Sequence, residues 1–240
     1  VVFVSTDTCD RYRHLHTKHN FVVLHNGIDA TEIDAYVRDV TRAAARARIG
    51  SCQEKKIITT VGTICERKAQ HLLVEAAARL RTRSDFSCYL VGQHPDLADH
   101  CLRKIHHLIE RYQLQACVKV VPATPEVYDY YRASDVFVLC SQEEGYNRAL
   151  LEAEAFGLPI VTTPCPGVNE QVRHRINALI YPMSDSGMLA GHLQQLLDDP
   201  DSRRRMGHAS RQTFECLKSY PEMLAEYERI ISRCALLERM

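Results

Sequence analysis

The sequence lacks an excess of charge, since 30 lysines and arginines balance 30 aspartates and glutamates over 240 residues. A protein that binds a nucleic-acid backbone normally carries a basic excess, so we expect no nucleic-acid partner. No apolar run approaches the roughly 18 residues of a transmembrane helix. The N-terminal segment VVFVSTDTCD has neither a basic n-region nor a cleavage site, which argues against a signal peptide. It begins with Val instead of Met, which indicates a fragment or a processed product.

Metal-binding spacings are also missing. No two of the ten cysteines are three positions apart, so there is no Cys-x-x-Cys clamp for zinc or thiol exchange. Cys88, Cys117 and Cys140 stand in apolar, strand-like runs, where free cysteine behaves as a small hydrophobic residue. We expect reduced thiols in a cytoplasmic protein, with a secreted disulfide protein as the alternative. The histidines within 14–19 have no Cys or carboxylate at metal spacing, which favours a solvated basic helix.

The ten glycines exclude several enzyme classes. No two of them stand at positions i and i+2, so the GxGxxG fingerprint of dinucleotide-binding proteins is absent. The GK[ST] of a P-loop and the GxSxG nucleophile elbow are absent as well. A nicotinamide oxidoreductase, a standard P-loop NTPase and an α/β-hydrolase are therefore disfavoured.

What the sequence does contain is an alternation of apolar strand-like runs and helical patterns, which indicates parallel βαβ units. Right-handed crossovers then predict a doubly wound, Rossmann-like α/β sheet. Residues 1–29 read as a strand, a basic helix and a short strand outside this sheet. The expected strands are 56–62, 86–92, 117–122, 135–141, 158–164 and 177–182, and the expected helices are 31–48, 68–83, 96–113, 125–134, 148–157 and a helical region from 184 with breaks near Pro200 and Pro221.

In such a sheet, ligands bind outside the carboxyl ends of the strands. The loop 141–148 lies at one of these ends, and Asn147 is expected to cap the helix that follows. The backbone amides of residues 147–150 would then form an anion site suited to a diphosphate. Arg67 and Lys68 follow the neighbouring strand, where their charges would neutralise phosphate oxygens.

Two carboxylates accompany this loop. Glu144 lies in the loop, and Glu152 lies in the second turn of the helix, where a carboxylate can accept hydrogen bonds from vicinal sugar hydroxyls. The alternative is that both are exposed acids near a helix N-terminus and that Arg67 and Lys68 are a solvated pair. However, a lysine at a helix start is mildly unfavourable for stability, because its charge lies at the positive end of the helix dipole. Its position is therefore better explained by a bound anion than by helix stability.

The segment SQEEGYNRALLEAEAFGLPIVTTPCPGVNEQV resembles the signature of retaining glycosyltransferases of the GT-B fold, family 4. Glu144 and Glu152 match the Glu-x7-Glu pair of that family. VGTICERKAQHLLVEAA is similar to its phosphate-binding segment, with Gly62 in the glycine position and Lys68 at the lysine. HNGID, YRASDVFVLCS, NALIYP and LLDDPDSRRRMGHASR match further landmarks in order, so the resemblance covers nearly the whole chain.

The resemblance implies a role for each matching residue. Glu144 is expected near the transferred sugar as the catalytic-site carboxylate, and Glu152 at the ribose hydroxyls. The donor diphosphate is expected to contact Gly62, Arg67, Lys68, Asn147, Arg148 and Ala149. The chain departs from the family pattern at Thr63, Ala69, Asn147 and Pro166, where the family often has arginine at the first position and glycine at the others.

The resemblance also implies a domain organisation. Residues 1–29 match the end of an N-terminal acceptor domain with its linker, 30–220 the nucleotide-sugar-binding domain, and 221–240 a helix that crosses back to the missing domain. Its apolar stripe contains Leu224, Tyr227, Ile230, Ile231 and Cys234; packing on the sheet of its own domain is the alternative.

The expected activity is a hexosyltransferase-type, retaining transfer of a sugar from a nucleotide-diphosphate donor to an acceptor hydroxyl, with this chain incomplete for catalysis. We expect no metal or other cofactor, since Asp199-Pro-Asp201, the only Asp-x-Asp, reads as a surface turn. The partners expected are the donor and the missing acceptor domain, and peripheral membrane association of the full-length enzyme stays open. The alternatives are a sugar-nucleotide epimerase of similar fold and a non-catalytic nucleotide-sugar-binding module.

Overall fold

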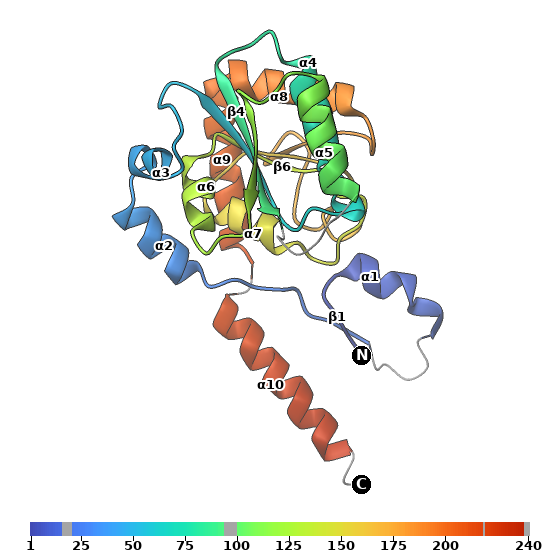
Figure 1. Cartoon of the computed structure of the whole chain (residues 1–240). Coiled ribbons are helices and arrows are strands. Elements are labelled where there is room, and N and C mark those ends of the chain that lie inside the picture. Colours follow the sequence, from blue (N-terminus) through green and yellow to red (C-terminus); the bar gives the residue numbers. More distant parts are fainter. Residues whose placement is uncertain (16–20, 94–99, 218, 238–240) are drawn as a thin grey trace.

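The structure, a computed structural model, describes residues 1–15, 21–93, 100–217 and 219–237. Most of them form an α/β domain, from which an N-terminal segment and a C-terminal helix extend (Figure 1). All pairings in its six-stranded sheet are parallel, and the order is β5-β4-β3-β6-β7-β8. The predicted doubly wound sheet is therefore confirmed. The strands are β3 (Lys56–Val61), β4 (Phe86–Gln93), β5 (Val118–Pro122), β6 (Val136–Leu139), β7 (Ile160–Thr162) and β8 (Ala178–Ile180).

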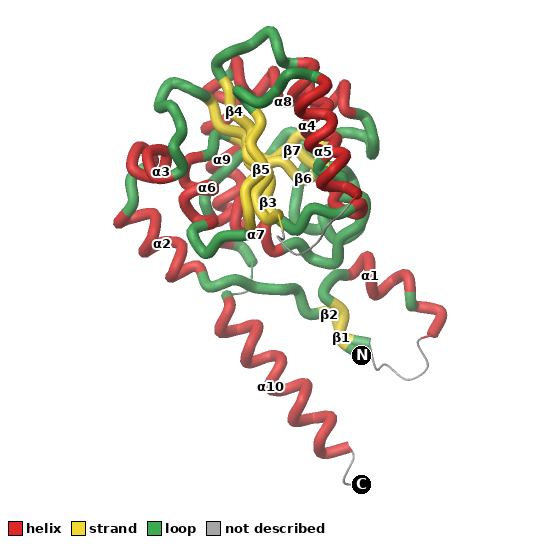
Figure 2. The backbone as a smooth tube through the Cα atoms, in the orientation of Figure 1, coloured by secondary structure: helices red, strands yellow, loops and turns green. Residues whose placement is uncertain are grey.

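Helices cover both faces of this sheet, which makes a three-layer sandwich (Figure 2). One layer contains α4, α5 and α8, with α4 packing on both of the others, and the other layer contains α3 beside α6 and α7 beside α9. The inner strands β6 and β7 are buried at every residue because each layer covers them, as their continuous apolar runs predict. The helices are α3 (Arg42–Arg48), α4 (His71–Arg79), α5 (His100–Arg111), α6 (Val127–Ala133), α7 (Arg148–Ala155), α8 (Ser186–Asp198) and α9 (Pro200–Glu215).

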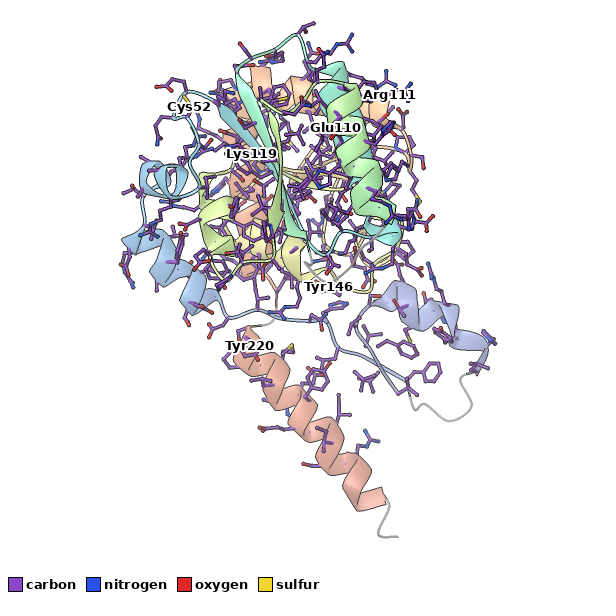
Figure 3. The ribbon with its side chains drawn as sticks, in the orientation of Figure 1. Cys52, Glu110, Arg111, Lys119, Tyr146 and Tyr220 are labelled. Carbon is purple, nitrogen blue, oxygen red and sulfur yellow. The ribbon has the colours of Figure 1, made fainter. Side chains whose placement is uncertain are left out.

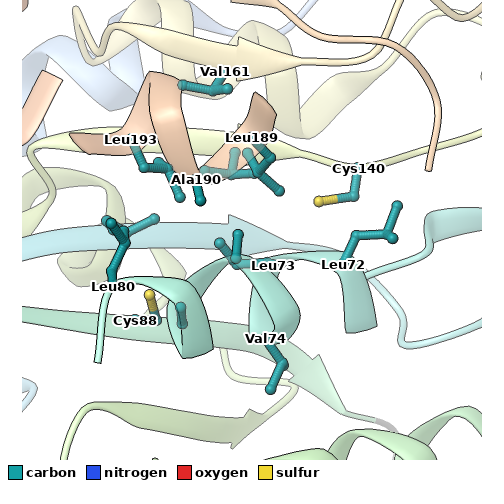
Figure 4. Packing of buried hydrophobic residues seen from close by; sticks show 14 of the residues in the cluster. Leu72, Leu73, Val74, Leu80, Cys88, Cys140, Val161, Leu189, Ala190 and Leu193 are labelled. Carbon is teal, nitrogen blue, oxygen red and sulfur yellow. The ribbon is translucent and has the colours of Figure 1, made fainter. Parts of the chain in front are cut away.

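The largest apolar cluster lies between the sheet and the layer of α4 and α8 (Figure 4). Leu73 of α4 and Leu193 of α8 are fully buried there, and each contributes about 1.5–3 kcal/mol to folding. Cys88 of β4 and Cys140, which directly follows β6, are buried in the same cluster. They act as small hydrophobic residues, as predicted.

Two helices differ from the sequence prediction. The expected helix 31–48 is broken into α2 (Ala30–Asp39) and α3, because Val40 is extended and Thr41 caps α3 by accepting a hydrogen bond from the Ala44 amide (3.1 Å). The expected helix 68–83 begins only at His71. Glu66–Lys68 form a 3₁₀ turn instead, and Ala69 follows in the left-handed region with a φ of 47°. That backbone conformation favours glycine, which the resemblance has at this position.

The N-terminal segment forms its own small unit. Its strands β1 (Val2–Phe3) and β2 (Val22–Val23) pair in parallel with one another and belong to a two-stranded sheet, separate from the main one as predicted. Helix α1 (Thr6–Arg11) and a 3₁₀ turn (Arg13–Leu15) connect them. His14 is exposed in that turn, which is not the basic helix expected for 14–19. The histidines at 16 and 19 lie outside the described residues.

The last helix, α10 (Tyr220–Leu237), extends away from the sheet (Figures 1 and 2). The expected break near Pro221 is confirmed, and the alternative that this helix packs on the sheet of its own domain is not observed. Leu224 and Ile231 of the predicted stripe are 43% and 64% exposed, while the structure does not describe the side chain of Cys234. None of the described helices combines the length and apolarity needed to cross a membrane.

Candidate functional site

The chain order reverses between β3 and β6, which are neighbours although β4 and β5 come between them in sequence. Ligands of doubly wound sheets bind at the carboxyl ends of the strands at such a switch point. Here the loops after the two strands meet, as the sequence predicts. Lys68 Nζ lies 2.6 Å from Glu144 Oε1, and Arg67 Nη1 lies 3.2 Å from Glu144 Oε2. The arginine also donates a hydrogen bond to the backbone carbonyl of Glu143 (2.6 Å).

Glu144 is buried in this cluster and is held in its charged form. Burial alone would raise the pKa of its carboxyl, but Lys68, with smaller contributions from Ser141 and Arg67, outweighs that effect and lowers the pKa. Two cations therefore converge on one carboxylate. Lys68 itself is largely buried, whereas Arg67 is half exposed. The cluster can offer positive charge to an anionic ligand that reaches the loop.

Gly62 and Lys68 lie close together at the end of β3. A Cβ built on Gly62, whose φ is 142°, would be 3.7 Å from the Cε atom of Lys68. On the other side of Gly62, a Cβ built on Gly92 would come within 2.6 Å of the Gly62 carbonyl oxygen. The two glycines thus allow the ends of β3 and β4 to approach closely, and the lysine side chain passes over that edge.

Asn147 caps α7, as predicted from the sequence. Its side-chain oxygen accepts a hydrogen bond from the Leu150 amide (2.8 Å). The Gln171 side chain binds Asn147 at two points, accepting from its amide (2.9 Å) and donating to its carbonyl (3.1 Å). Asn147 has an ordinary φ of −81°, so its backbone conformation does not require the glycine that the family pattern has at this position.

This arrangement corrects the expected anion site, which included the amides of residues 147–150. Those of Asn147 and Leu150 are occupied, whereas those of Arg148 and Ala149 make no hydrogen bond within the described part of the chain. Arg148 and Ala149 therefore present the free N–H groups, at the positive end of the helix dipole.

Glu152 does not join the Glu144–Lys68 pair. Its carboxylate accepts a hydrogen bond from the Tyr131 hydroxyl (2.7 Å), and it lines a cavity of about 440 Å³ together with Arg148 and Tyr128. Burial raises the pKa of the Glu152 carboxyl, and the Tyr131 hydrogen bond and Arg148 counteract this only in part. A carboxylate beside an open cavity can accept hydrogen bonds from ligand hydroxyls.

The turn after β7 packs directly on the candidate loop. A Cβ on Gly167 would lie 1.7 Å from the Gly145 carbonyl oxygen, so only glycine fits at this contact. Pro166, the departure noted in the sequence, precedes this glycine and leaves the close approach intact. The Gly167 amide donates to Asp7 of α1 (3.0 Å).

Further contacts bring the N-terminal segment onto the same turn. The Glu170 carboxylate accepts hydrogen bonds from the amides of Thr6 (3.1 Å) and Asp7 (2.9 Å) and lies 3.0 Å from His25 Nε2. The His25 ring stacks on Tyr146, which faces this segment (Figure 3). The sequence does not predict the roles of Asp7, Glu170, Tyr131 and Gln171, because contacts between residues far apart in sequence leave no local signal.

The described residues contain no group of three or more His, Cys, Asp or Glu that could hold a metal ion. Asp199 of the Asp-x-Asp is the N-cap of α9 and accepts from the Ser202 amide (2.9 Å), which agrees with a turn at a helix end. The nine cysteines whose side chains the structure describes are free thiols.

Comparison with known proteins identifies the family. The family described as "Glycosyl transferases group 1" matches residues 41–213. A D-inositol 3-phosphate glycosyltransferase of Thermobispora bispora is 30% identical over 188 residues, which are 72% of this chain and 44% of that protein. The chain spans about half the length of the curated relatives it matches.

Solved structures show the same fold. A glycosyltransferase from Rickettsia africae aligns with a TM-score of 0.87 at 20% identity, covering 96% of this chain and 62% of that one. The Anabaena protein Alr3699/HepE, solved in complex with UDP, aligns with a TM-score of 0.84 at 19% identity, covering 97% and 63%. The family match extends over more than half of the chain and includes both loops of the switch point. This chain therefore belongs to the group 1 glycosyl transferases.

Proposed function

We propose that this chain is the donor-binding half of a retaining, family 4 glycosyltransferase, which transfers a sugar from a nucleotide-diphosphate donor to an acceptor hydroxyl. The observation that carries the proposal is the meeting of Lys68 and Glu144 at the β3/β6 switch point, beside the start of α7. The named relatives are glycosyltransferases, and a protein of the same fold was solved with UDP, which supports a nucleotide-sugar ligand.

The donor diphosphate is bound by cations and by the helix start. Lys68 and Arg67 contact its oxygens, and the free amides of Arg148 and Ala149 donate hydrogen bonds to it. Gly62 keeps the edge of β3 open beside the lysine. Asn147 acts through its cap, which holds the start of α7 in place.

The two carboxylates have different roles. Glu152 accepts hydrogen bonds from the ribose hydroxyls, since it lines the cavity beside α7. Glu144 lies near the transferred sugar. Its negative charge, held by Lys68, faces the region where positive charge develops at the anomeric carbon as the bond to the diphosphate breaks.

The sugar transfer requires that the nucleoside diphosphate be stabilised as it leaves. The oxygen that departs with the nucleoside diphosphate gains negative charge, which Lys68, Arg67 and the helix start stabilise. That leaving group accepts the proton of the acceptor hydroxyl on the face it has left, so the new bond forms with retention. Because these cations and the helix dipole supply the charge, the proposed transfer uses no metal.

The domain limits are part of the proposal. Residues 1–29 are the end of an acceptor-binding domain and its linker, 30–220 bind the donor, and 221–240 are the helix that returns to the acceptor domain. The exposed Leu224 and Ile231 on α10 and the half-length alignment to the relatives support this division.

Product analysis tests the function. We expect the 240-residue chain to bind a UDP-, GDP- or ADP-sugar without transferring the sugar to an added acceptor. A longer protein that carries the acceptor domain should transfer the sugar with retention, as observed by proton NMR at the anomeric centre. Conversion of the donor to its 2-epimer would support the epimerase alternative. Donor binding without hydrolysis or transfer by the longer protein would support a non-catalytic module.

A further inference from the structure

We propose that this chain carries a second anion site, for a small phosphate-bearing molecule, at the amino ends of β6 and β7. This edge of the sheet is opposite the Lys68–Glu144 loop, since Asp135 directly precedes β6 and Pro159 directly precedes β7. A cavity of about 350 Å³ opens there. It is lined by Arg42, Arg203 and Arg204, the Ser134–Asp135 turn and the Gly157–Pro159 turn.

The charges around this cavity do not balance. Asp135 is buried and lies 2.6 Å from Arg42, 2.8 Å from Arg46 and 4.0 Å from Arg203. Within the described ranges, none of the three arginines has another carboxylate within 4.0 Å. Three guanidinium groups thus share one carboxylate, which also accepts from the Ile57 amide (2.7 Å).

Backbone carbonyls offset only part of this excess. Arg42 donates to the carbonyl of Ser134 (2.7 Å), and Arg203 donates to that of Leu197 (2.9 Å), near the carboxyl ends of α6 and α8. Such ends carry roughly half a negative charge each, and the positive end of the α9 dipole beside the cavity is already capped by the Asp199 carboxylate. The three guanidinium charges still outweigh Asp135 and the two partial negative charges. The cluster therefore remains positive in a chain whose overall net charge is zero.

The arginines also keep unused hydrogen-bond donors. Nη1 of Arg42 and Nη2 of Arg203 have no partner among the described residues, and Arg204 uses only one of its terminal nitrogens, on the exposed Asp201. All three side chains line the same cavity. Arg42 and Arg204 are 44% and 78% exposed, so a ligand that enters the cavity can reach their nitrogens from solvent.

Phosphate is the ligand chemistry that fits. Its oxygens accept paired hydrogen bonds from guanidinium groups, and its charge matches the excess of the cluster. The cavity has room for a phosphate group with a small organic part, such as a sugar phosphate.

Calorimetric titration with pyrophosphate, inorganic phosphate and glucose 1-phosphate tests the site. The Lys68→Ala variant weakens the anion site at the switch point, so the second site is identified as the part of the retained binding that depends on Arg42 and Arg204. We expect this variant to bind at least one of the three anions with a stoichiometry near one. Adding Arg42→Gln and Arg204→Gln should weaken that binding at least tenfold.

The control is Arg38→Gln, because Arg38 is 73% exposed and pairs with a neighbouring aspartate outside the cavity. Arg204→Gln alone serves if the double substitution fails to fold, since this side chain is 78% exposed. Absence of binding in Lys68→Ala would overturn the second site. Equal weakening by Arg38→Gln and Arg204→Gln would also overturn it, by showing general attraction to a basic surface. Because the test does not use the nucleotide-sugar reaction, its failure would leave the proposed function unaffected.

Discussion

At the scale of single residues, the proposed role of Glu152 predicts that the ligand is recognised through its ribose hydroxyls. We expect Glu152→Gln to weaken nucleotide binding by about 1.5–3 kcal/mol, the range for hydrogen bonds to a charged group. A 2′,3′-dideoxy nucleotide should bind the unaltered chain more weakly than its ribose form, because the same hydrogen bonds are missing. Titration of both nucleotides measures the effect, with Glu143→Gln as the exposed control. Equal affinity for the two nucleotides would exclude the ribose role.

The buried carboxyl of Glu154 should make the stability of the folded chain depend on pH. It is fully buried, its Oε1 atom accepts from Asn177 (3.2 Å), and its Oε2 atom has no hydrogen-bond partner in the described structure. Burial raises the pKa of this carboxyl well above the ordinary value. The folded state therefore keeps the proton at a pH where the unfolded chain, with a pKa near 4.3, has lost it.

Stability should consequently fall as the pH rises from that unfolded pKa towards the higher folded one. We expect Glu154→Gln to remove this loss, so its gain in melting temperature should be larger at pH 8 than at pH 4. Thermal unfolding followed by circular dichroism at both pH values tests this, again with Glu143→Gln as control. A gain that is equal at both pH values would show that Glu154 is not protonated in the folded state.

At the scale of elements, the caps of α7 and α9 form a matched pair. Asn147 and Asp199 each accept a hydrogen bond from an amide in the first turn, at 2.8 and 2.9 Å. Replacing either by alanine should cost about 1 kcal/mol of stability. Only Asn147→Ala should also weaken nucleotide binding, because α7 alone begins at the donor site. Denaturant unfolding and calorimetry on both variants decide this, and an equal loss of nucleotide affinity in Asp199→Ala would contradict it.

The positions of the strands could be predicted from the sequence, whereas one break between helices and one backbone conformation could not. The strands and their order along the chain follow from apolar runs and glycine stops, and the strand-end rule brings Lys68 and Glu144 together. The break at Thr41 was missed although threonine is a common cap, since alanines and arginines continue the helical pattern on both sides. The positive φ of Ala69 was not predictable from the residue type, because alanine seldom adopts it.

Parts of the site depend on contacts that only the folded chain creates. Gln171 binds Asn147 across 24 positions, and the Gly167 amide reaches Asp7 across 160. Neither pair follows from spacing along one helix or strand. The sequence alone therefore could not show that the backbone amide of Asn147 is hydrogen-bonded, whereas those of Arg148 and Ala149 are free.

At the scale of the whole molecule, the N-terminal segment is held on the turn after β7. Glu170 binds the Thr6 and Asp7 amides, and Asp7 in turn binds the Gly167 amide. We expect Glu170→Ala to release this segment, so that the Thr6 and Asp7 amides exchange with solvent at least tenfold faster while strands β3 and β6 keep their protection. Hydrogen exchange read by NMR measures this, and Glu110→Ala, an exposed position on α5, is the control. Unchanged exchange at both amides would show that Glu170 does not hold the segment.

The donor site itself is tested most directly by calorimetric titration of the 240-residue chain with UDP, GDP and ADP. At least one of them should bind, and Lys68→Ala should weaken it by about 1.5–3 kcal/mol, the range for a charge-assisted contact. Lys119→Ala, which removes a lysine from β5 at the edge of the sheet, should leave the affinity unchanged (Figure 3). Unchanged affinity for every nucleotide in Lys68→Ala, or no nucleotide binding by the unaltered chain, would contradict a donor diphosphate site at the β3/β6 switch point.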